Sequence, residues 1–338
     1  PDYELTRFYK VDSFFRFYMP FYQFFPSLFK IPYQLTSNAV RLKATQRFLE
    51  LRYQESIEKF LAQENPDICI STYFMYNFNL DTHKNINRKP FINIVPDPRS
   101  IHPLFISSAA DANFVFDDQA KKNGQHLHPE ATYIPSGWFV RPQFEDKYDQ
   151  ISVRKELKLD EKMFTIFVAS GSEGTTMIMK VLPALVLTPA PVQIVVACGN
   201  NNNLLKGISG LKKLLKSTNS ANKLIGLHFT KDIHKYMQAA DLVVGKAGPN
   251  MLFESVATRT PFFAITHISG QEDGNLDIIR DYNLGYVEEN PLKAQKLLHQ
   301  IIENPAELHQ FVPYLKTMAE YNQGAKKKLV ELVEKLIN

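Results

Sequence analysis

Short apolar runs alternate with amphipathic stretches throughout the second half of the chain, and this alternation restricts the possible folds more than any other sequence feature. The apolar runs predict five strands, at residues 163–169, 192–198, 223–228, 242–244 and 262–265. The stretches between and after them predict five helices, at residues 175–187, 204–216, 232–239, 249–258 and 272–282. Buried strands separated by helices are typical of a parallel sheet that is covered on both faces. We therefore predict an α/β fold with a doubly wound sheet.

The first half repeats the alternation less regularly. A helical pattern over residues 36–63 precedes four apolar runs, at residues 68–71, 91–95, 113–116 and 132–134. A chain of 338 residues has the length of about two average domains. We therefore predict one domain over residues 1–145, a second over 146–314, and a last helical segment over 315–338.

Composition excludes several classes of protein. With 44% hydrophobic and 22% charged residues, the chain is neither intrinsically disordered nor collagen-like. Cys69 and Cys198 lie far apart in apolar runs, which favours free thiols in a reducing cytosol over a disulfide scaffold. No stretch reaches the roughly 18 to 20 apolar residues of a spanning helix, and no signal peptide is apparent. We predict a cytoplasmic protein that binds no nucleic acid.

Thirteen aromatic side chains crowd the first 34 positions, where they alternate with basic residues. Pro20, Pro26 and Pro32 disfavour one long helix there. Because aromatic side chains settle at the headgroup level of membranes, one interpretation is that segment 7–34 faces a membrane. The other interpretation is an irregular segment that covers the protein core, and the sequence does not decide between the two.

The loops that follow the predicted strands carry the candidate binding residues, because ligands of an open α/β sheet lie beyond the carboxyl ends of its strands. The first loop holds Gly171, Ser172, Glu173 and Gly174 before a predicted helix. Its small residues would let backbone N–H groups approach an anion at the positive helix start. The G-x-G-x-x-G spacing of a dinucleotide site is absent, which disfavours a nicotinamide ligand. A tight turn without a ligand is the alternative.

The second loop, residues 245–250, has the same character. Pro249 suits the first position of a helix and Gly248 its cap, so the N–H groups from Asn250 onward would point at an anion. Lys246 would add a positive charge, and Glu254 could accept hydrogen bonds from two vicinal hydroxyls. The alternatives are a solvated lysine and an ordinary helical glutamate.

Polar side chains dominate the third loop, residues 268–275. Its donors and acceptors, among them Gln271, Glu272 and Asn275, suit a hydroxyl-rich ligand such as a sugar. A helix cap with acidic residues in its first turn would look similar. After another predicted strand, Phe229 and Thr230 could stack on a flat base or hydrogen-bond to its edge.

Two residues of the first half are weak candidates for catalysis. Asp97 and His102 follow a predicted strand, and there they would face the same cleft as the three loops. A solvated turn is the alternative. No pair of His or Cys residues has the spacing of a structural zinc site, so we predict no metal.

Taken in order, these segments resemble glycosyltransferase family 28, and within it the diacylglycerol glycosyltransferases and monogalactosyldiacylglycerol synthases. They are also similar to the peptidoglycan N-acetylglucosaminyltransferase group. Residues 269–275, Ser-Gly-Gln-Glu-Asp-Gly-Asn, are similar to the family's P-G-Q-E-x-G-N. Residues 171–174 resemble its diphosphate loop, and residues 137–144 resemble its interdomain G-x-x-x-R-P-x-F. Six such blocks follow one another in the family's order between residues 65 and 290.

The resemblance implies a GT-B architecture, in which two Rossmann-like domains face a cleft and the last helix crosses back to the first domain. It implies an inverting enzyme that moves a hexose from a UDP-sugar to a lipid such as diacylglycerol by direct displacement, with no metal or other cofactor. Glu254 would hold the ribose, Phe229 would lie by the uracil, and Gln271, Glu272 and Asn275 would hold the sugar. The enzyme would lie peripherally on the inner face of an anionic membrane. The oligomeric state is not predicted.

One part of the family pattern has no counterpart in this chain. The family's first strand and its G-G-G-H-type loop, which contributes to catalysis, would precede Pro1. We therefore expect a first domain that is truncated at its N-terminus, and we can assign the general base no further than Asp97. Two other functions remain compatible with the sequence: a catalytically silent sugar-nucleotide-binding protein, and a UDP-sugar 2-epimerase of the same architecture.

Overall fold

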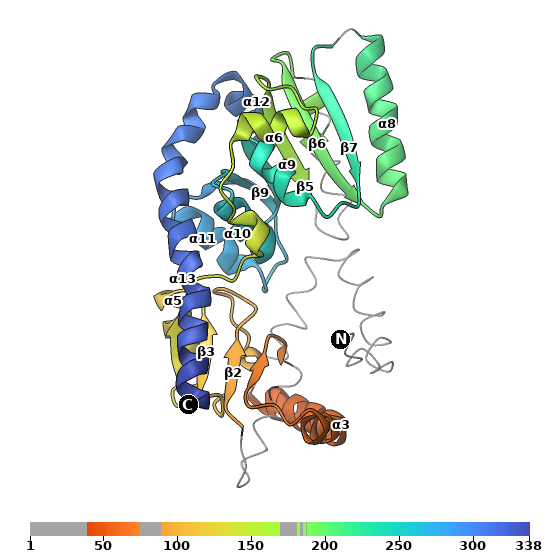
Figure 1. Cartoon of the computed structure of the whole chain (residues 1–338). Helices are drawn as coiled ribbons and strands as arrows, with labels where there is room; N and C mark the ends of the chain where they lie inside the picture. Colours follow the sequence, from red (N-terminus) through yellow and green to blue (C-terminus); the bar gives the residue numbers. More distant parts are fainter. Residues whose placement is uncertain are drawn as a thin grey trace.

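The computed structural model describes residues 39–74, 77, 89–169, 181–182, 185–186, 188–218 and 220–338. Within these residues the chain forms two parallel β-sheets, one at the bottom and one at the top of Figure 1. The aromatic segment 7–34 and the predicted anion-binding residues Gly171, Ser172, Glu173 and Gly174 lie outside the described residues. The predicted α/β fold is confirmed.

The first sheet contains the four apolar runs of the first half, in the order β1-β2-β3-β4. Its strands are β1 (Cys69–Ser71), β2 (Phe91–Ile94), β3 (Ala112–Val115) and β4 (Tyr133–Pro135). Helix α3 (Ala39–Glu64) precedes the sheet, η4 (Pro103–Phe105) lies between β2 and β3, and α5 (Asp118–Leu127) lies between β3 and β4. The sequence did not predict α5, because this helix is mostly polar and buries only Ala120 and Gly124.

The second sheet has the order β10-β9-β8-β5-β6-β7, with all its strands parallel. The five predicted strands correspond to β5 (Phe164–Ala169), β6 (Val192–Gly199), β7 (Lys223–His228), β8 (Leu242–Lys246) and β9 (Phe262–Thr266). Four predicted helices correspond to α8 (Asn202–Ser217), α9 (Ile233–Ala239), α10 (Pro249–Ala257) and α11 (Asp273–Asp281). The predicted helix 175–187 lies largely outside the described residues, although residues 181–182 and 185–186 are helical. The structure adds β10 (Gly285–Val287) and α12 (Pro291–Glu303).

The strand order of the second sheet fixes where a ligand can bind. The chain enters the sheet at its centre with β5, proceeds outward through β6 to β7, and then returns to place β8 on the other side of β5. A crevice opens at the carboxyl ends of the strands where the order reverses. Ala169 and Gly245 are partners in register, so the loops that follow β5 and β8 begin side by side at this reversal. The crevice therefore lies at the carboxyl ends of β5 and β8, where the second predicted loop begins.

The last helix, α13 (Val312–Ile337), joins the two halves of the molecule (Figure 1). It follows η6 (Pro305–Phe311), and Leu315 and Met318 in its first half belong to the main hydrophobic core. In its second half, Leu329, Leu332, Val333 and Leu336 pack against the first-sheet residues Ile92, Ala112 and Phe114. One continuous helix thus buries apolar surface on both domains.

Hydrogen bonds fasten α13 to the residue after β3 and to the segment that connects the domains. The Tyr321 hydroxyl donates to the Phe116 carbonyl at 2.8 Å, and the Asn322 side chain accepts from the Trp138 backbone N–H at 2.9 Å. The connecting segment continues through η5 (Pro142–Phe144) and α6 (Gln150–Glu156) into β5. The domain boundaries at residues 145 and 314 remain predictions.

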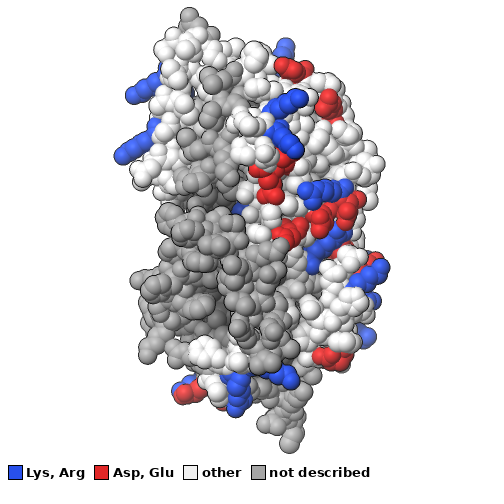
Figure 2. Space-filling view, turned by 180° about the vertical axis from the view of Figure 1, so that it is seen from behind, with Lys and Arg blue, Asp and Glu red and all other residues white. Residues whose placement is uncertain are grey.

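Figure 2 shows one face of the molecule, and the described residues on this face carry both positive and negative charges. On the right of that view, Lys and Arg side chains lie beside Asp and Glu side chains. This part of the face therefore carries no extended field of one sign. Among the described residues, no helix combines the length and the apolar character needed to cross a membrane.

Candidate functional site

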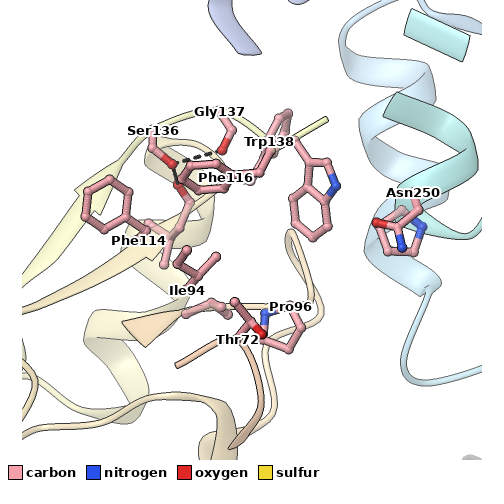
Figure 3. Close-up of a pocket in the computed structure, with 13 residues that line it drawn as sticks. Thr72, Ile94, Pro96, Phe114, Phe116, Ser136, Gly137, Trp138 and Asn250 are labelled. Carbon is pink, nitrogen blue, oxygen red and sulfur yellow. Dashed lines mark hydrogen bonds between the residues drawn. The ribbon is translucent and has the colours of Figure 1, made fainter. Parts of the chain in front are cut away.

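A pocket of about 350 Å³ lies between the carboxyl ends of the first-sheet strands and the start of α10 (Figure 3). Ile94, Pro96, Phe116 and Trp138 line it from the first half of the chain, and Pro249 and Asn250 from the second. In Figure 3, Trp138 and Asn250 face each other from opposite sides. The pocket is therefore mainly apolar on one wall and ends at a helix start on the other.

The start of α10 has the geometry predicted from the sequence. Gly248 is the N-cap and Pro249 takes the first helical position, so the first N–H groups of the helix have no intrahelical acceptor. A Cβ atom at Gly248 would lie 3.4 Å from Nζ of Lys246 and 3.5 Å from Oε1 of Glu272. A charged pair thus lies directly beside the positive end of this helix.

Contacts between the second and third predicted loops bring their candidate residues together. Lys246 donates to Oε1 of Glu272, whose Oε2 accepts from the Ile268 N–H at 2.7 Å. The Asn275 amide donates to the Ala247 carbonyl at 2.7 Å. Glu272 and Asn275 are only 3% and 1% exposed. In this structure, both side chains hold the two loops together beneath the crevice.

Gln271 reaches across the cleft to the other domain. Its Nε2 donates to Oδ1 of Asp97 at 3.3 Å, and Asp97 is 4% exposed. Among the described residues, Oδ2 of Asp97 is buried without a hydrogen-bond partner. The solvated turn that was the alternative for Asp97 is therefore wrong.

The environment of Asp97 favours its protonated form. Burial is the largest cause and raises the pKa of Asp97 to about 7. The hydrogen bond from Gln271 and the charge of Lys246 lower this pKa, whereas the charge of Glu272 raises it. A carboxyl group with such a pKa can take up and release a proton near neutral pH.

His102, the other weak candidate for catalysis, is also buried, so the solvated turn is wrong for it as well. Its Nδ1 accepts from the Leu104 N–H at 3.1 Å and thereby caps η4. Its ring lies beside Phe105, with 5.8 Å between the ring centroids. These contacts bind His102 to its own loop.

Glu254 lies on the first turns of α10 and lines a second cavity of about 110 Å³ with Arg141 and Asn250. Its Oε1 accepts from Nε of Arg141 at 2.8 Å and from Nη2 at 2.7 Å. Burial raises the pKa of Glu254, and Arg141 opposes this shift. The same carboxylate keeps Oε2 for a further donor.

Phe229 and Thr230 lie at the carboxyl end of β7, two strands away from β5. The Phe229 side chain is 64% exposed. The Thr230 hydroxyl accepts from the Asp232 N–H at 3.0 Å. The pair therefore lies at the outer side of the second sheet's carboxyl edge, where Phe229 presents an open aromatic surface.

Positive charge at the crevice comes from Lys246 and from the helix start at Gly248. Together they suit an anion such as a diphosphate. In the part of the chain that the structure describes, no three side chains of His, Cys, Asp or Glu are grouped so that they could hold a metal ion.

Sequence reasoning missed the contacts that tie the two domains together. Arg99 donates to Oδ2 of Asp117 at 3.1 and 2.9 Å, and to Oδ2 of Asp281 in α11 at 2.5 Å. The Tyr282 hydroxyl also donates to Asp117, at 2.9 Å. Arg99 lies two residues beyond Asp97, but no pattern in the sequence identifies its partner in α11. The helix that begins at the third loop is thus anchored to the first domain.

Trp138, the single tryptophan of the chain, lies within the interdomain pattern of residues 137–144 but was not predicted as a site residue. It stacks on Phe253 of α10, with 5.2 Å between the ring centroids, and lines both cavities. Its position in the connecting segment between two polar loops could have identified it as a site residue from the sequence.

Comparison with known proteins agrees with this architecture. The structure of MurG from Acinetobacter baumannii superposes with a TM-score of 0.61 at 14% identity, covering 84% of this chain and 78% of that chain. The predicted GT-B architecture is confirmed.

Relatives of known description cover most of this chain. The processive diacylglycerol beta-glucosyltransferase of Bacillus pumilus is 24% identical over 265 residues, which are 75% of this chain and 67% of that protein. The probable monogalactosyldiacylglycerol synthase 3 of Oryza sativa subsp. japonica is 26% identical over 260 residues, 73% of this chain and 50% of that protein. The chain thus spans about half the length of this plant relative.

Family models cover both halves of the sequence. The monogalactosyldiacylglycerol synthase model matches residues 3–131, and the glycosyltransferase family 28 C-terminal domain model matches residues 165–334, which is half of the chain. The chain belongs to glycosyltransferase family 28.

Proposed function

We propose that this protein transfers a hexose from a UDP-sugar to a hydroxyl of a diacylglycerol-type lipid, with inversion at the anomeric carbon and without a metal ion. The names of the relatives support the donor and acceptor classes. One structural observation carries the proposal: the loop at residues 268–275 contacts the buried Asp97 across the cleft, beside Lys246 and the start of α10. Groups suited to a sugar, a diphosphate and an acceptor proton thus surround one crevice.

The second domain would hold the donor. The diphosphate would lie over the first N–H groups of α10, where Lys246 could exchange its contact with Glu272 for a phosphate oxygen. Glu254, whose Oε1 is occupied by Arg141, would accept from the ribose hydroxyls with Oε2. Phe229 and Thr230 would border the uracil, and the loop that carries Gln271, Glu272 and Asn275 would border the hexose. The leaving UDP gains its charge where the helix start and Lys246 are positive.

The first domain would hold the acceptor. The apolar wall formed by Pro96, Phe116 and Trp138 suits the glycerol end of a lipid and the first methylenes of its chains. The acceptor oxygen attacks the anomeric carbon and forms the new glycosidic bond. The bond from that carbon to the diphosphate breaks, and its electron pair leaves with UDP. The proton of the acceptor hydroxyl passes to Asp97, which acts as general base.

An assay of purified protein with radiolabelled UDP-glucose or UDP-galactose and diacylglycerol in mixed micelles tests this function. We expect transfer in the presence of EDTA and a β-linked product from an α-linked donor. Donor binding without transfer would favour the silent sugar-nucleotide-binding protein, and release of a 2-epimer would favour the epimerase. Membership in glycosyltransferase family 28 supports transfer over both alternatives.

Removal of the Lys246 charge should weaken donor binding. Lys246→Ala deletes a charged hydrogen-bond donor, so the binding free energy of UDP should fall by about 1 to 3 kcal/mol. Calorimetry with and without EDTA measures this loss. Lys223→Ala is the matched control, because Lys223 begins β7 at the opposite end of the same sheet and pairs with Asp160. UDP binding that requires magnesium, or an equal loss in both variants, would contradict the proposed donor site.

A further inference from the structure

His267, the residue directly after β9, is held between two carboxylates. Its Nδ1 lies 2.7 Å from Oε1 of Glu289, and its Nε2 lies 2.9 Å from Oδ1 of Asp273. An ionised carboxylate can only accept a hydrogen bond, so both ring nitrogens must donate. A neutral imidazole has one N–H group, so two ionised carboxylates at these distances require the imidazolium form of His267.

The surroundings of His267 agree with this charge. The hydrogen bond to Glu289 is the largest cause that raises the pKa of His267 above its ordinary value of 6.5, and Asp273 adds to the rise. Burial opposes it, since only 17% of the side chain is exposed. Glu289, after β10, and Asp273, at the start of α11, are the charged groups that act on the ring.

These contacts close the loop that connects β9 to α11. Oδ1 of Asp273 also accepts from the Gly270 N–H at 2.7 Å, so one carboxylate oxygen fastens both the histidine and the middle of the loop. Between these points lie Gln271, which crosses the cleft to Asp97, and Glu272, which pairs with Lys246. The position of the Gln271 side chain therefore depends on the charged ring, whereas Glu272 is also held by Lys246 and by the Ile268 N–H.

We propose that His267 is a positioning residue for the hexose of the donor: its imidazolium joins Asp273 to Glu289 and fixes the loop that presents Gln271 to the sugar. This inference rests on the proposed function of the crevice. It assigns to His267 no contact with the substrate itself. UDP, which lacks the hexose, should bind independently of it.

The charge of His267 makes this positioning depend on pH. Because its pKa is raised in the folded protein, the imidazolium is fully present below about 6.5 and is lost as the pH rises through the raised value. When His267 loses one proton, one ring nitrogen carries a lone pair that faces a carboxylate oxygen. That hydrogen bond is then lost, and the loop is no longer held by it. The KM for the UDP-sugar should rise over this range, with little change in kcat.

Two substitutions test the inference. His267→Gln removes the charge and should raise the KM for UDP-sugar about tenfold at pH 6, as expected for a lost hydrogen bond between charged groups. The affinity for UDP, measured by calorimetry, should not change. His267→Lys keeps a positive charge, so it should restore a low KM that no longer rises between pH 6 and pH 9. His309→Gln, at an exposed histidine of η6, is the control and should keep the parental KM profile.

Three outcomes would overturn the inference. If His267→Gln weakened UDP and UDP-sugar equally, the histidine would support the whole domain and not the hexose loop. A parental KM profile in His267→Gln would show that the loop does not need the charge. If the unmodified protein bound no UDP-sugar, the proposed function would fail and the inference would fail with it. If the unmodified protein bound UDP-sugar and either of the first two results were obtained, only the inference would fail.

Discussion

Asp97→Asn should slow sugar transfer by about 100- to 10,000-fold, the contribution that a positioned general base typically makes. Asparagine has nearly the same size and can still hydrogen-bond to Gln271, but it cannot take a proton from the acceptor hydroxyl. Binding of the UDP-sugar should remain, because its diphosphate and ribose contacts lie elsewhere. Turnover of radiolabelled donor and calorimetry on the same preparation measure the two properties.

The stability of the Asp97→Asn variant separates chemistry from unfolding. Because the folded protein raises the pKa of Asp97 from 3.8 to about 7, the stability that its bound proton contributes is lost as the pH rises through this interval. A neutral amide avoids the burial of a charge, so at pH 8 the variant should melt no lower than the parent. Asp111→Asn is the matched control, because Asp111 precedes β3 at the amino end of the same sheet and accepts from the Phe91 N–H. Near-parental turnover of Asp97→Asn would refute the assignment of the base.

The same carboxyl group predicts the acidic limb of the pH profile. Transfer requires ionised Asp97, so kcat should increase with pH up to about 7 and then level off. The KM for the donor should rise on the alkaline side, where His267 loses its proton. The pH dependence of kcat should disappear in Asp97→Asn, and the pH dependence of KM should disappear in His267→Gln.

The sequence predicted the framework of the fold because the strands of a parallel sheet are buried on both faces. Residues 163–169 and 262–265, for instance, form apolar runs that coincide with β5 and β9 to within one residue. Strand β10 escaped prediction, because it begins with a glycine and its three residues are only partly buried. The strand order was not predicted at all, since pairing depends on contacts between residues far apart in the chain.

The candidate site was predictable where local geometry decides it. Gly248 and Pro249 form a helix start in any context, and the structure has them as cap and first residue. The burial of Asp97 was not predictable, because its partner Gln271 lies 174 residues further along the chain. His102 lies five residues further along the same segment, but its ring nitrogen accepts a hydrogen bond from the Leu104 N–H of its own loop. The loop residues therefore indicated where the site lies. Only the contact between Asp97 and Gln271, which joins the two domains, distinguished Asp97 from His102 as a candidate for catalysis.

Gly274→Ala should reduce kcat by about 100-fold, the loss that a displacement of about 1 Å between reacting groups can cause. Gly274 lies in the first turn of α11, where its N–H donates to Oγ of Ser100 in the first domain at 2.7 Å. An added Cβ would lie 2.7 Å from Cβ of Arg99 and 3.0 Å from both the backbone N and Oγ of Ser100. Since Cβ of Arg99 cannot move without its backbone, the methyl group must separate the two domains at this contact.

The effect should be confined to transfer, because the separation moves Asp97 away from the donor loop without touching the start of α10. UDP affinity in Gly274→Ala should therefore equal that of the parent, and the activity with lipid acceptor should fall. Gly210→Ala is the matched control, because Gly210 lies within α8 and alanine favours a helix over glycine by about 0.5 to 1 kcal/mol. Among the described residues, no atom beyond the helix's own backbone lies within 4 Å of the position that its methyl group would take. That variant should be at least as stable as the parent and fully active. If Gly274→Ala instead kept its kcat and lost UDP affinity, Gly274 would serve the donor site alone, and catalysis would not depend on the close contact between α11 and the loop that carries Asp97.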